Sequence, residues 1–376
     1  MAKSAVQNRG LLLSSFKESL QIVDLPSPDA STGSVVVAVL ATFVAPYAAN
    51  VYNGTMQFNL PLPMTPGFSC VGRVHKTGAD ATSLKENDLV FVDPVVRGRD
   101  SADVTFLLGH FEGLHPAGRS LMENVWRNGT LQKFVAVPLE NCFRLNENRL
   151  VKELSYTHAE LATLLPYAVA AGPLLETANL QAGETIVIGP AGGTYSGAAV
   201  EIALALGANV VALGRSEEKL ASLRKVLGDT ERLQTVVMTG EPAKDVPTLQ
   251  KLLPDGADVH NNWTPTGASE AIYLNTVGAV LKRNARVVLS GGTNTTEGLP
   301  NGLVVLKDIS VTGKFMYNPK TVQGLIGFVS SGLLKIGERS GAVLRTFGLE
   351  QSLEALEVAT KHGSWKDYIV VTPNDA

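Results

Sequence analysis

A glycine-rich turn over residues 188–200 is the first segment whose residue types suggest chemistry. It reads Ile-Gly-Pro-Ala-Gly-Gly-Thr-Tyr-Ser-Gly-Ala-Ala-Val and joins an apolar run of strand length to a helical stretch. Small residues let the backbone approach a pyrophosphate, and the free N–H groups that begin the helix hold its negative charge. The sequence therefore predicts a dinucleotide site that includes Gly189, Ala191, Gly193, Thr194 and Tyr195.

The turn departs from the G-x-G-x-x-G pattern of such sites. Its nearest fit is Ala191-x-Gly193-x-x-Ser196, followed by Gly197. Glycine-rich turns also serve as plain structural turns, which is the alternative interpretation. The strand before it and the helix after it favour the cofactor, and we interpret Tyr195 as a stacking or packing residue.

The end of the next apolar strand distinguishes between the two nicotinamide cofactors. NAD sites place Asp or Glu about 20 residues beyond the first glycine, where the carboxylate binds the ribose 2′-OH. Residues 212–216 read Ala-Leu-Gly-Arg-Ser, with no carboxylate. The Arg215 guanidinium can bind a 2′-phosphate, with Gly214, Ser216 and Lys219 beside it. We predict NADP(H); the alternative is that Arg215 is a solvated loop residue.

Apolar runs alternate with helical stretches from about residue 155 onward. Strands are expected at 185–189, 210–214, 235–238, 257–260, 286–290 and 309–312, with helices at 198–206, 217–227 and 270–281 among them. This alternation predicts an α/β fold, with a Rossmann doubly wound parallel sheet covered on both faces. Ligands of open sheets bind at the carboxyl ends of the strands. Asn262, Gly291, Gly292 and Phe315 are therefore expected near the nicotinamide.

Composition excludes several classes of protein. The chain has 376 residues, of which 45% are hydrophobic and 18% charged, and its net charge is −3. This balance predicts a globular protein of two domains, with neither a nucleic-acid partner nor a membrane span. The two cysteines, Cys70 and Cys142, cannot form a disulfide framework or a four-cysteine zinc site. With no apolar leader, we expect a cytoplasmic protein.

Several motifs resemble the medium-chain dehydrogenase/reductase superfamily over nearly the whole chain. They are Met-Thr-Pro-Gly-Phe-Ser-Cys-Val-Gly-Arg-Val at 64–74, Leu-Lys-Glu-Asn-Asp-Leu-Val at 84–90 and the strand at 129–138. The resemblance implies a mainly β GroES-like catalytic domain (1–155 and 316–376) around a Rossmann NADP(H)-binding domain (156–315). It also implies a homodimer that pairs sheet edges, and a nicotinamide-ribose site at Gly291, Gly292 and Thr293.

The chain departs from the zinc-containing members of this family. Ala45 stands where they carry a cysteine ligand, and Phe68-Ser69 stand where they carry a His-Glu pair. Residues 97–118 lack the four structural cysteines of those members. His110 and His115, with Glu112 between them, are the remaining metal candidates, but isolated surface histidines are the commoner case. We expect no metal.

Tyr47 is the candidate catalytic hydrogen-bond donor. The segment Val44-Ala45-Pro46-Tyr47 resembles the "DPY" segment of zinc-independent alkenal and enone reductases, and we place Pro46 with the cofactor-binding residues. The alternative is that Tyr47 is a packing aromatic. Phe68, Tyr167 and Trp263 are expected either in an apolar substrate pocket or in the core, and charges such as Glu160 and Glu176 on solvated helix faces.

Without zinc, hydride transfer needs an acceptor that is already electrophilic. The leading hypothesis is therefore an NADPH-dependent oxidoreductase that reduces an activated C=C (an enone, enoyl group or quinone) of a small apolar substrate. A second hypothesis is a zinc-free ketone, aldehyde or imine reductase of a specialised pathway. A third, from another class, is a non-catalytic NADPH-binding scaffold or sensor.

Overall fold

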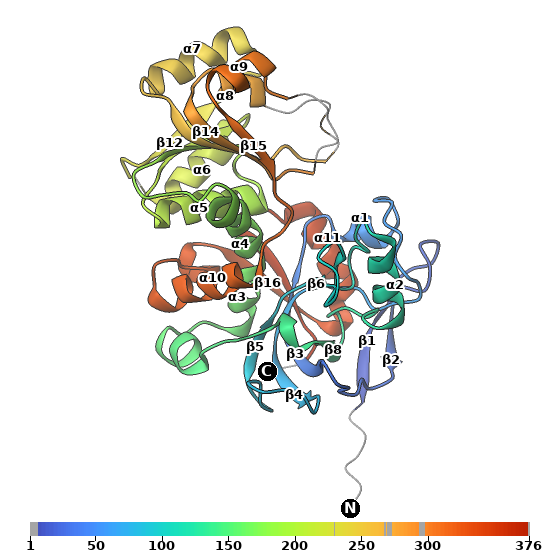
Figure 1. Ribbon diagram of the computed structural model, residues 1–376. Helices are drawn as coiled ribbons and strands as arrows, with labels where there is room; N and C mark the ends of the chain where they lie inside the picture. Colours follow the sequence, from blue (N-terminus) through green and yellow to red (C-terminus); the bar gives the residue numbers. More distant parts are fainter. Residues whose placement is uncertain (1–6, 229, 267, 269–272, 293–297, 375–376) are drawn as a thin grey trace, which may run out of the picture. The chain divides into compact units, whose positions relative to one another are not determined.

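The chain divides into two compact units, Met1–Leu165 with Lys335–Ala376, and Pro166–Leu334. The computed structural model describes residues 7–228, 230–266, 268, 273–292 and 298–374 (Figure 1). The sequence places the boundaries at 155/156 and 315/316. The structure keeps the helix Pro319–Ser331 in the second unit, because Asn318, its N-cap, is held by Glu176 of that unit through its N–H and Nδ2, both at 2.7 Å.

A seven-stranded sheet forms the centre of the first unit, in the order β16-β17-β3-β4-β5-β9, with β8 also paired to β3. The long central strand β3 is rich in β-branched residues that pack well in a buried sheet, and Val35, Val36, Val37 and Val39 are buried. The strands are β3 (Ser34–Val44), β4 (Cys70–Thr77), β5 (Leu89–Val92), β8 (Phe134–Pro138), β9 (Cys142–Arg144), β16 (Val343–Gly348) and β17 (Asp367–Thr372).

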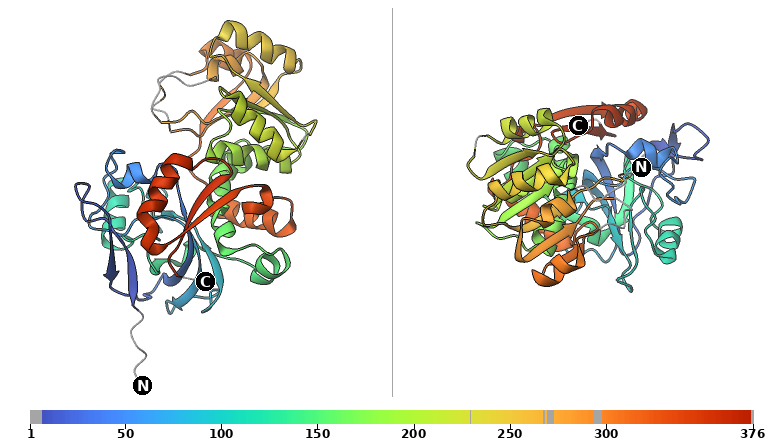
Figure 2. Two further views of the ribbon diagram at one scale, coloured as in Figure 1. Left: turned by 180° about the vertical axis from the view of Figure 1, so that it is seen from behind. Right: turned by 90° about the horizontal axis from the view of Figure 1, so that it is seen from above.

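Two hairpins and several short helices complete the first unit. The hairpins are β1 (Asn8–Leu12) with β2 (Gln21–Leu25) and β6 (Val95–Arg97) with β7 (Thr105–Leu107). The helix α11 packs on β16 and β17 (Figure 2). The helices are α1 (Ala48–Tyr52), α2 (Pro116–Asn124), η1 (Leu139–Asn141), η2 (Asn148–Glu153), α3 (His158–Ala162), η4 (Gly337–Ser340), η5 (Leu349–Gln351) and α11 (Ser352–His362).

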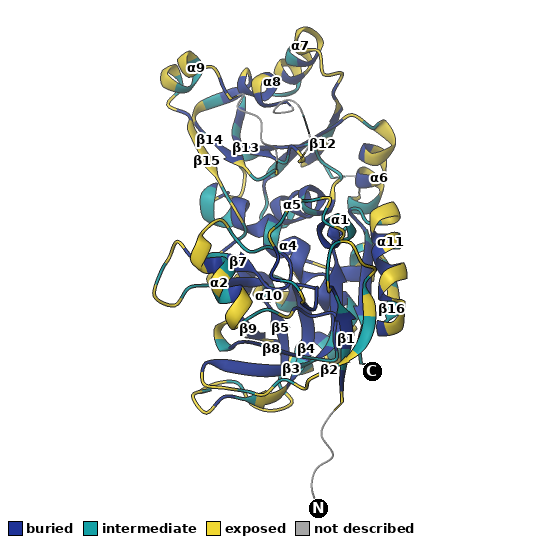
Figure 3. Cartoon of the chain, turned by 90° about the vertical axis from the view of Figure 1, so that its right-hand side faces the viewer, coloured by how far each residue is buried: buried dark blue, intermediate teal, exposed yellow. Residues whose placement is uncertain are grey.

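The second unit contains a six-stranded parallel sheet in the order β12-β11-β10-β13-β14-β15. This confirms the doubly wound sheet. The inner strands are buried, because helices cover both faces of such a sheet (Figure 3). The strands are β10 (Thr185–Gly189), β11 (Asn209–Gly214), β12 (Leu233–Val237), β13 (Ala257–Asn262), β14 (Leu281–Leu289) and β15 (Ser310–Gly313).

The helices of the second unit follow the alternating pattern, but two of them differ from the expected bounds. The helix expected at 198–206 is α5, which begins earlier, at Thr194. The helix expected at 270–281 is short in its described part, α8, and β14 begins at Leu281; residues 270–272 lie outside the described residues. The helices are α4 (Leu164–Ala171), η3 (Gly172–Thr177), α5 (Thr194–Ala205), α6 (Glu217–Leu227), α7 (Pro242–Leu252), α8 (Leu274–Gly278), α9 (Asn301–Leu306) and α10 (Pro319–Ser331).

Two glutamates expected on solvated faces are instead structural, and that expectation was wrong. Glu160 is 4% exposed, and its carboxylate accepts the N–H of Thr157 in the capping box of α3. Glu176 is partly buried and accepts hydrogen bonds from Lys314, Asn318 and Thr321. These donors hold the pKa of the Glu176 carboxyl below its usual range although burial alone would raise it.

No helix in the described part of the chain is long and apolar enough to cross a membrane.

Candidate functional site

The glycine-rich turn leads from β10 into α5, as the dinucleotide hypothesis requires. The Ala191 N–H donates to the Leu213 carbonyl at 2.6 Å, which ties the turn to the neighbouring strand β11. A Cβ on Gly189 would lie 3.0 Å from Leu213 Cβ, and Gly192 has φ +92°. Both positions therefore favour glycine. The turn is consequently held close to the sheet with little side-chain bulk.

The N-terminus of α5 suits an anion. Gly193 is its N-cap, and the Gly193 N–H donates to Ser196 Oγ at 3.1 Å. The first turn of α5 contains no acidic residue, so the positive end of the helix dipole is not neutralised there. Thr194 is buried, and the Tyr195 ring stacks with Trp263, with centroids 6.3 Å apart. The N-terminus of α5 therefore suits a pyrophosphate, and the stacked rings of Tyr195 and Trp263 would lie beside it.

Arg215 follows directly on Gly214 at the end of β11, and its side chain is exposed. Ser216 caps α6 by accepting the Lys219 N–H at 3.2 Å, so its hydroxyl is already placed at the start of that helix. Burial raises the pKa of the Tyr273 hydroxyl, and the positive charge of Arg215 acts on the same hydroxyl to lower it. Glu217 and Glu218, which were not predicted site residues, are two exposed carboxylates in the first turn of α6.

The strand register brings the other predicted cofactor residues to the same edge of the sheet. Gly189 is the partner of Asn262, and Asn262 is the partner of Leu289, two residues before the Gly291-Gly292 turn. Asn262 is buried, and its Oδ1 accepts the Thr264 N–H at 3.0 Å. A Cβ on Gly291 would lie 1.9 Å from the Thr264 carbonyl oxygen. The two loops after β13 and β14 therefore meet backbone to backbone.

The other predicted cofactor residues do not belong to these strand pairs. They are Gly292, Phe315, Thr293 and Pro46. The Gly292 carbonyl accepts a hydrogen bond from Thr266 Oγ1 at 3.0 Å. Phe315 follows β15, and 59% of its side chain is exposed. Thr293 lies outside the described residues. Pro46 belongs to the first unit, where a Cβ on Gly363 would lie 2.9 Å from Pro46 Cγ.

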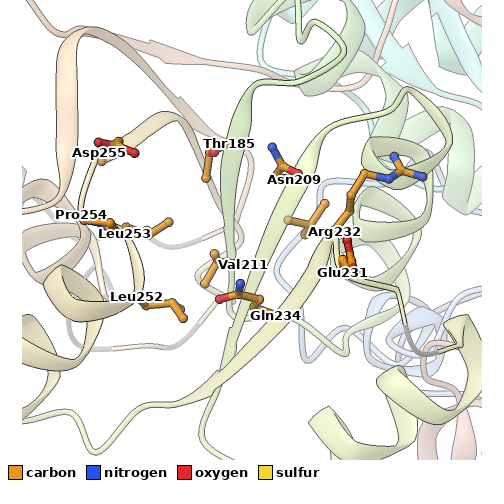
Figure 4. Close-up of a pocket in the computed structure, with 12 residues that line it drawn as sticks. Thr185, Asn209, Val211, Glu231, Arg232, Gln234, Leu252, Leu253, Pro254 and Asp255 are labelled. Atoms are coloured by element: carbon orange, nitrogen blue, oxygen red, sulfur yellow. The ribbon is translucent and has the colours of Figure 1, made fainter.

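A hollow of about 210 Å³ in the second unit lies at the opposite edge of the sheet (Figure 4). Thr185 and Asn209, which begin β10 and β11, line it together with Leu253 and Asp255. Open α/β sheets bind ligands at the carboxyl ends of their strands, and this hollow is at the amino ends. It is therefore not the predicted cofactor site.

His260 is a buried polar group that the sequence analysis missed. Its Nδ1 donates to the Val187 carbonyl at 3.0 Å, which leaves Nε2 as the unprotonated nitrogen. Asn262 Nδ2 lies 3.5 Å from that Nε2. Burial lowers the pKa of His260 to about 4, so the ring is neutral near pH 7. The polar run His-Asn-Asn at the end of an otherwise apolar strand is the signal that could have revealed it.

In the first unit, Tyr47 belongs to a group of aromatic rings around a buried histidine. We call Tyr47, Tyr52, Phe58, Phe68 and His110 the His110 cluster. Phe68 stacks on the His110 imidazole, with centroids 4.4 Å apart and an interplanar angle of 21°. The Tyr47 and Tyr52 rings lie 5.5 and 5.6 Å from it, and that of Phe58 lies 6.5 Å away. Tyr47 is the half-buried N-cap residue of α1.

His110 is neutral and is not a surface residue, so that expectation was wrong. It is 1% exposed, and burial lowers the pKa of its imidazole to about 3. Tyr52 Oη accepts the Gly67 N–H at 3.0 Å and lies 3.0 Å from His110 Nδ1, and burial raises the pKa of Tyr52. The apolar neighbours in Thr-Phe-Leu-Leu-Gly-His-Phe, residues 105–111, are the signal that could have indicated this burial.

The residues at the family's zinc-ligand positions do not fit zinc. Ala45 and Phe68 offer no donor atom, and the Ser69 hydroxyl donates to the Val92 carbonyl at 2.9 Å. His115 Nδ1 accepts the Ala117 N–H, and Glu112 Oε1 accepts the Asn59 N–H. Within the described residues, no three His, Cys, Asp or Glu side chains come together as a metal site. The absence of metal nevertheless stays a prediction.

Comparison with known families identifies the class of protein. Residues 31–147 match the alcohol dehydrogenase GroES-like domain, and residues 196–331 match the zinc-binding dehydrogenase family. The chain belongs to the medium-chain dehydrogenase/reductase family, whose members are oxidoreductases. Nicotinamide cofactor binding is expected of that family. The expected GroES-like and Rossmann combination is confirmed, whereas the zinc-independent subtype stays a prediction.

Individual relatives are distant but extend over most of the chain. An alcohol dehydrogenase of Moraxella sp. (strain TAE123) is 26% identical over 336 residues, 87% of this chain and 90% of the relative. D-xylulose reductase A of Aspergillus niger is 24% identical over 307 residues, 79% of this chain and 78% of the relative. The crystal structure of a putative zinc-binding dehydrogenase from Sinorhizobium meliloti 1021 bound to NADP is similar with a TM-score of 0.75 and 18% identity, covering 98% of this chain and 100% of that one.

Proposed function

We propose that the protein is an NADPH-dependent reductase that transfers a hydride to an activated C=C without zinc. The observation that carries this proposal is the stacking of Phe68 on His110 at 4.4 Å, at a position where zinc-containing relatives hold a ligand. An aromatic ring there offers no Lewis acid to polarise a simple carbonyl. The substrate must then bring its own electrophilic carbon, as an enone, enoyl group or quinone does.

Residues of the second unit suit NADPH. When bound, the cofactor supplies a hydride. The N–H groups at the start of α5 would hold the pyrophosphate, and the exposed Arg215 would bind the 2′-phosphate with Ser216 and Lys219 beside it. Asn262 and the closely packed Gly291 would border the nicotinamide end. The NADP bound by the S. meliloti relative is consistent with this choice.

Tyr47 is the proposed donor toward the substrate oxygen. It lies half-buried at the start of α1, with its ring against His110. The apolar rings of the His110 cluster suit a small apolar substrate, since they exclude water from around a developing negative charge. The surrounding Ala45 and Ala49 supply no charge that would attract a charged substrate.

A second candidate is reduction of a ketone, aldehyde or imine. The names of the relatives favour it, because they are called alcohol dehydrogenase and D-xylulose reductase. A third, an NADPH-binding scaffold or sensor, would follow from the altered glycine pattern. The position of the transferred hydrogen distinguishes both candidates from reduction of an activated C=C.

The test is the position of the transferred hydrogen. The protein would be given NADPH deuterated at the nicotinamide C4, with an enone, and the product analysed by mass spectrometry. Deuterium on the β-carbon of a saturated ketone is the expected result. Deuterium on the carbinol carbon would establish carbonyl reduction instead. Tight NADPH binding with no turnover on any enone, quinone or carbonyl would establish the scaffold.

We further propose a cytoplasmic homodimer that pairs its β15 strands. β15 is an edge strand of the six-stranded sheet, with Val311 44% exposed, and the neighbouring α9 carries Val305 and Leu306, 73% and 76% exposed. An apolar unpaired edge is a template for pairing with a second chain. Cys70 and Cys142 are both free, as in a reducing compartment.

A further inference from the structure

We propose that His110 donates a hydrogen bond from Nε2 to the carbonyl oxygen of the substrate, as a neutral imidazole that does the work of a Lewis acid. This inference rests on the proposed reductase function. It gives the substrate oxygen a second hydrogen-bond donor besides Tyr47. It also gives a function to the buried Nε2–H group of His110, which otherwise has no hydrogen-bond partner among the described residues.

The hydrogen bonds around Tyr52 determine which nitrogen of His110 carries the proton. The Tyr52 hydroxyl has one proton and accepts the Gly67 N–H at 3.0 Å. The acceptor that lies beside it is His110 Nδ1, also at 3.0 Å. We assign the Tyr52 proton to this hydrogen bond, which makes Nδ1 the acceptor and the unprotonated nitrogen. The neutral ring then carries its proton on Nε2.

The Nε2–H group has no hydrogen-bond partner among the described residues, although it is shielded from solvent. Buried polar groups are nearly always paired, so an unpaired donor needs a reason. Burial lowers the pKa of the ring to about 3, so the group stays a neutral donor instead of becoming a charged one. A donor held neutral in apolar surroundings strengthens any hydrogen bond that it makes to a negatively charged oxygen.

The rings around His110 indicate how a substrate oxygen would reach it. Phe68 is buried and stacked on one face of the imidazole, whereas Tyr47 and Phe58 are half-buried. The exposed side of the His110 cluster is therefore formed by Tyr47 and Phe58. A flat conjugated ligand would pack against these rings and place its oxygen between the Tyr47 hydroxyl and Nε2–H.

The chemical step is balanced without any proton leaving His110. The substrate takes up the hydride at its β-carbon, the π electrons of its C=C shift toward the carbonyl, and the carbonyl oxygen becomes an enolate oxygen. His110 stabilises that oxygen by a hydrogen bond and keeps its proton. The α-carbon then takes a proton from water, which gives the saturated ketone.

The direct test is ¹⁵N NMR of histidine-labelled full-length protein, which needs no turnover. We expect His110 to show an unprotonated Nδ1 and a protonated Nε2 at pH 7. Cyclohexenone, as the probe, should move the Nε2–H proton resonance downfield. A protonated Nδ1, or a resonance unmoved at saturating cyclohexenone, would overturn the proposal.

Variants supply the second readout. His110→Phe keeps a flat ring without a donor, and we expect kcat to fall roughly 100-fold while the NADPH dissociation constant stays unchanged. His110→Gln restores a donor and should recover part of kcat. Tyr52→Phe removes the hydroxyl that fixes the tautomer, so both tautomers of His110 should appear in the NMR spectrum and kcat should fall by less than in His110→Phe. His75→Phe, a change at an exposed histidine of β4, is the matched control.

The experiments can refute the role of His110 and the reductase function independently of each other. If the wild-type protein reduces conjugated acceptors and His110→Phe keeps its kcat while binding NADPH normally, His110 is not the donor and the reductase stands. If the wild-type protein reduces no acceptor, the reductase fails, and the tautomer and the cyclohexenone shift still decide whether His110 forms an oxygen-binding site. Circular dichroism and the ¹⁵N NMR spectrum of each variant show whether the first unit, which carries the substitutions, has folded.

Discussion

Phe68 and the imidazole of His110 lie nearly parallel, with centroids 4.4 Å apart and planes 21° from each other. The contact buries the histidine, and burial keeps it neutral. In zinc-containing members of the family, the position of Phe68 holds a ligand. We therefore propose that hydrogen-bond donors act here where those members use a metal.

Arg215→Ala should weaken NADPH binding far more than NADH binding. A guanidinium on a 2′-phosphate forms charge-assisted hydrogen bonds, so we expect a loss of roughly tenfold to hundredfold for NADPH alone. Cofactor fluorescence titration measures both constants. Lys225→Ala, an exposed change in the last turn of α6, should alter neither. Equal weakening of both cofactors by Arg215→Ala would refute the 2′-phosphate assignment.

Tyr47→Phe should lower kcat by roughly 100-fold, because one donor to the substrate oxygen is lost at the transition state. The NADPH dissociation constant should stay as in the wild type, since Tyr47 is placed on the substrate oxygen. Steady-state kinetics on an enone, together with an NADPH titration, separates the two quantities. An unchanged kcat would show that Tyr47 is only a packing residue.

Stability should fall as the pH drops from 7 to 5. The pKa values of His110 and His260 are lowered from 6.5 to about 3 and about 4, so the unfolded chain binds more protons in this range. Each histidine should cost about 2 kcal/mol of unfolding free energy between pH 7 and pH 5, and little above pH 7.

Urea unfolding at the two pH values measures this effect. His110→Phe removes one histidine of lowered pKa and should reduce the pH-dependent loss by about 2 kcal/mol. Carboxyls with lowered pKa values, such as that of Glu176, contribute only at lower pH. Equal stability at pH 5 and pH 7 would contradict the burial of neutral histidines.

Val311→Lys should convert the proposed dimer into monomers. A lysine on an edge strand places a charge where two β15 strands would pair, and such charges block edge-to-edge pairing. Light scattering after size-exclusion chromatography gives the molar mass. Val343→Lys on β16, an edge strand of the other sheet, is the matched control and should remain dimeric. A monomeric wild type would contradict the proposed interface.

The Rossmann elements were predictable because their signals are local. The strand 185–189 and the helix 217–227 have the expected bounds, since the first is a continuous β-branched run and the second follows the N-cap Ser216. The turn between β10 and α5 follows from its small residues. The edge of the sheet where Gly189 and Asn262 meet follows from parallel strand order.

The first unit was less predictable because its contacts join distant parts of the chain. Tyr52 and His110 are 58 residues apart, and their hydrogen bond has no local pattern. In the second unit, Glu176 accepts hydrogen bonds from Asn318, 142 residues away, and this contact holds α10 in that unit. His110 was expected on the surface, and only its apolar neighbours in the sequence could have indicated its burial.

The most direct test of a zinc-free C=C reductase is NADPH consumption with cyclohexenone and with cyclohexanone, each with and without a metal chelator. We predict consumption with cyclohexenone at the same rate in both conditions, and little or none with cyclohexanone, which lacks the conjugated C=C. Consumption confined to cyclohexanone and abolished by the chelator would contradict the proposed mechanism and would show a metal-dependent carbonyl reductase.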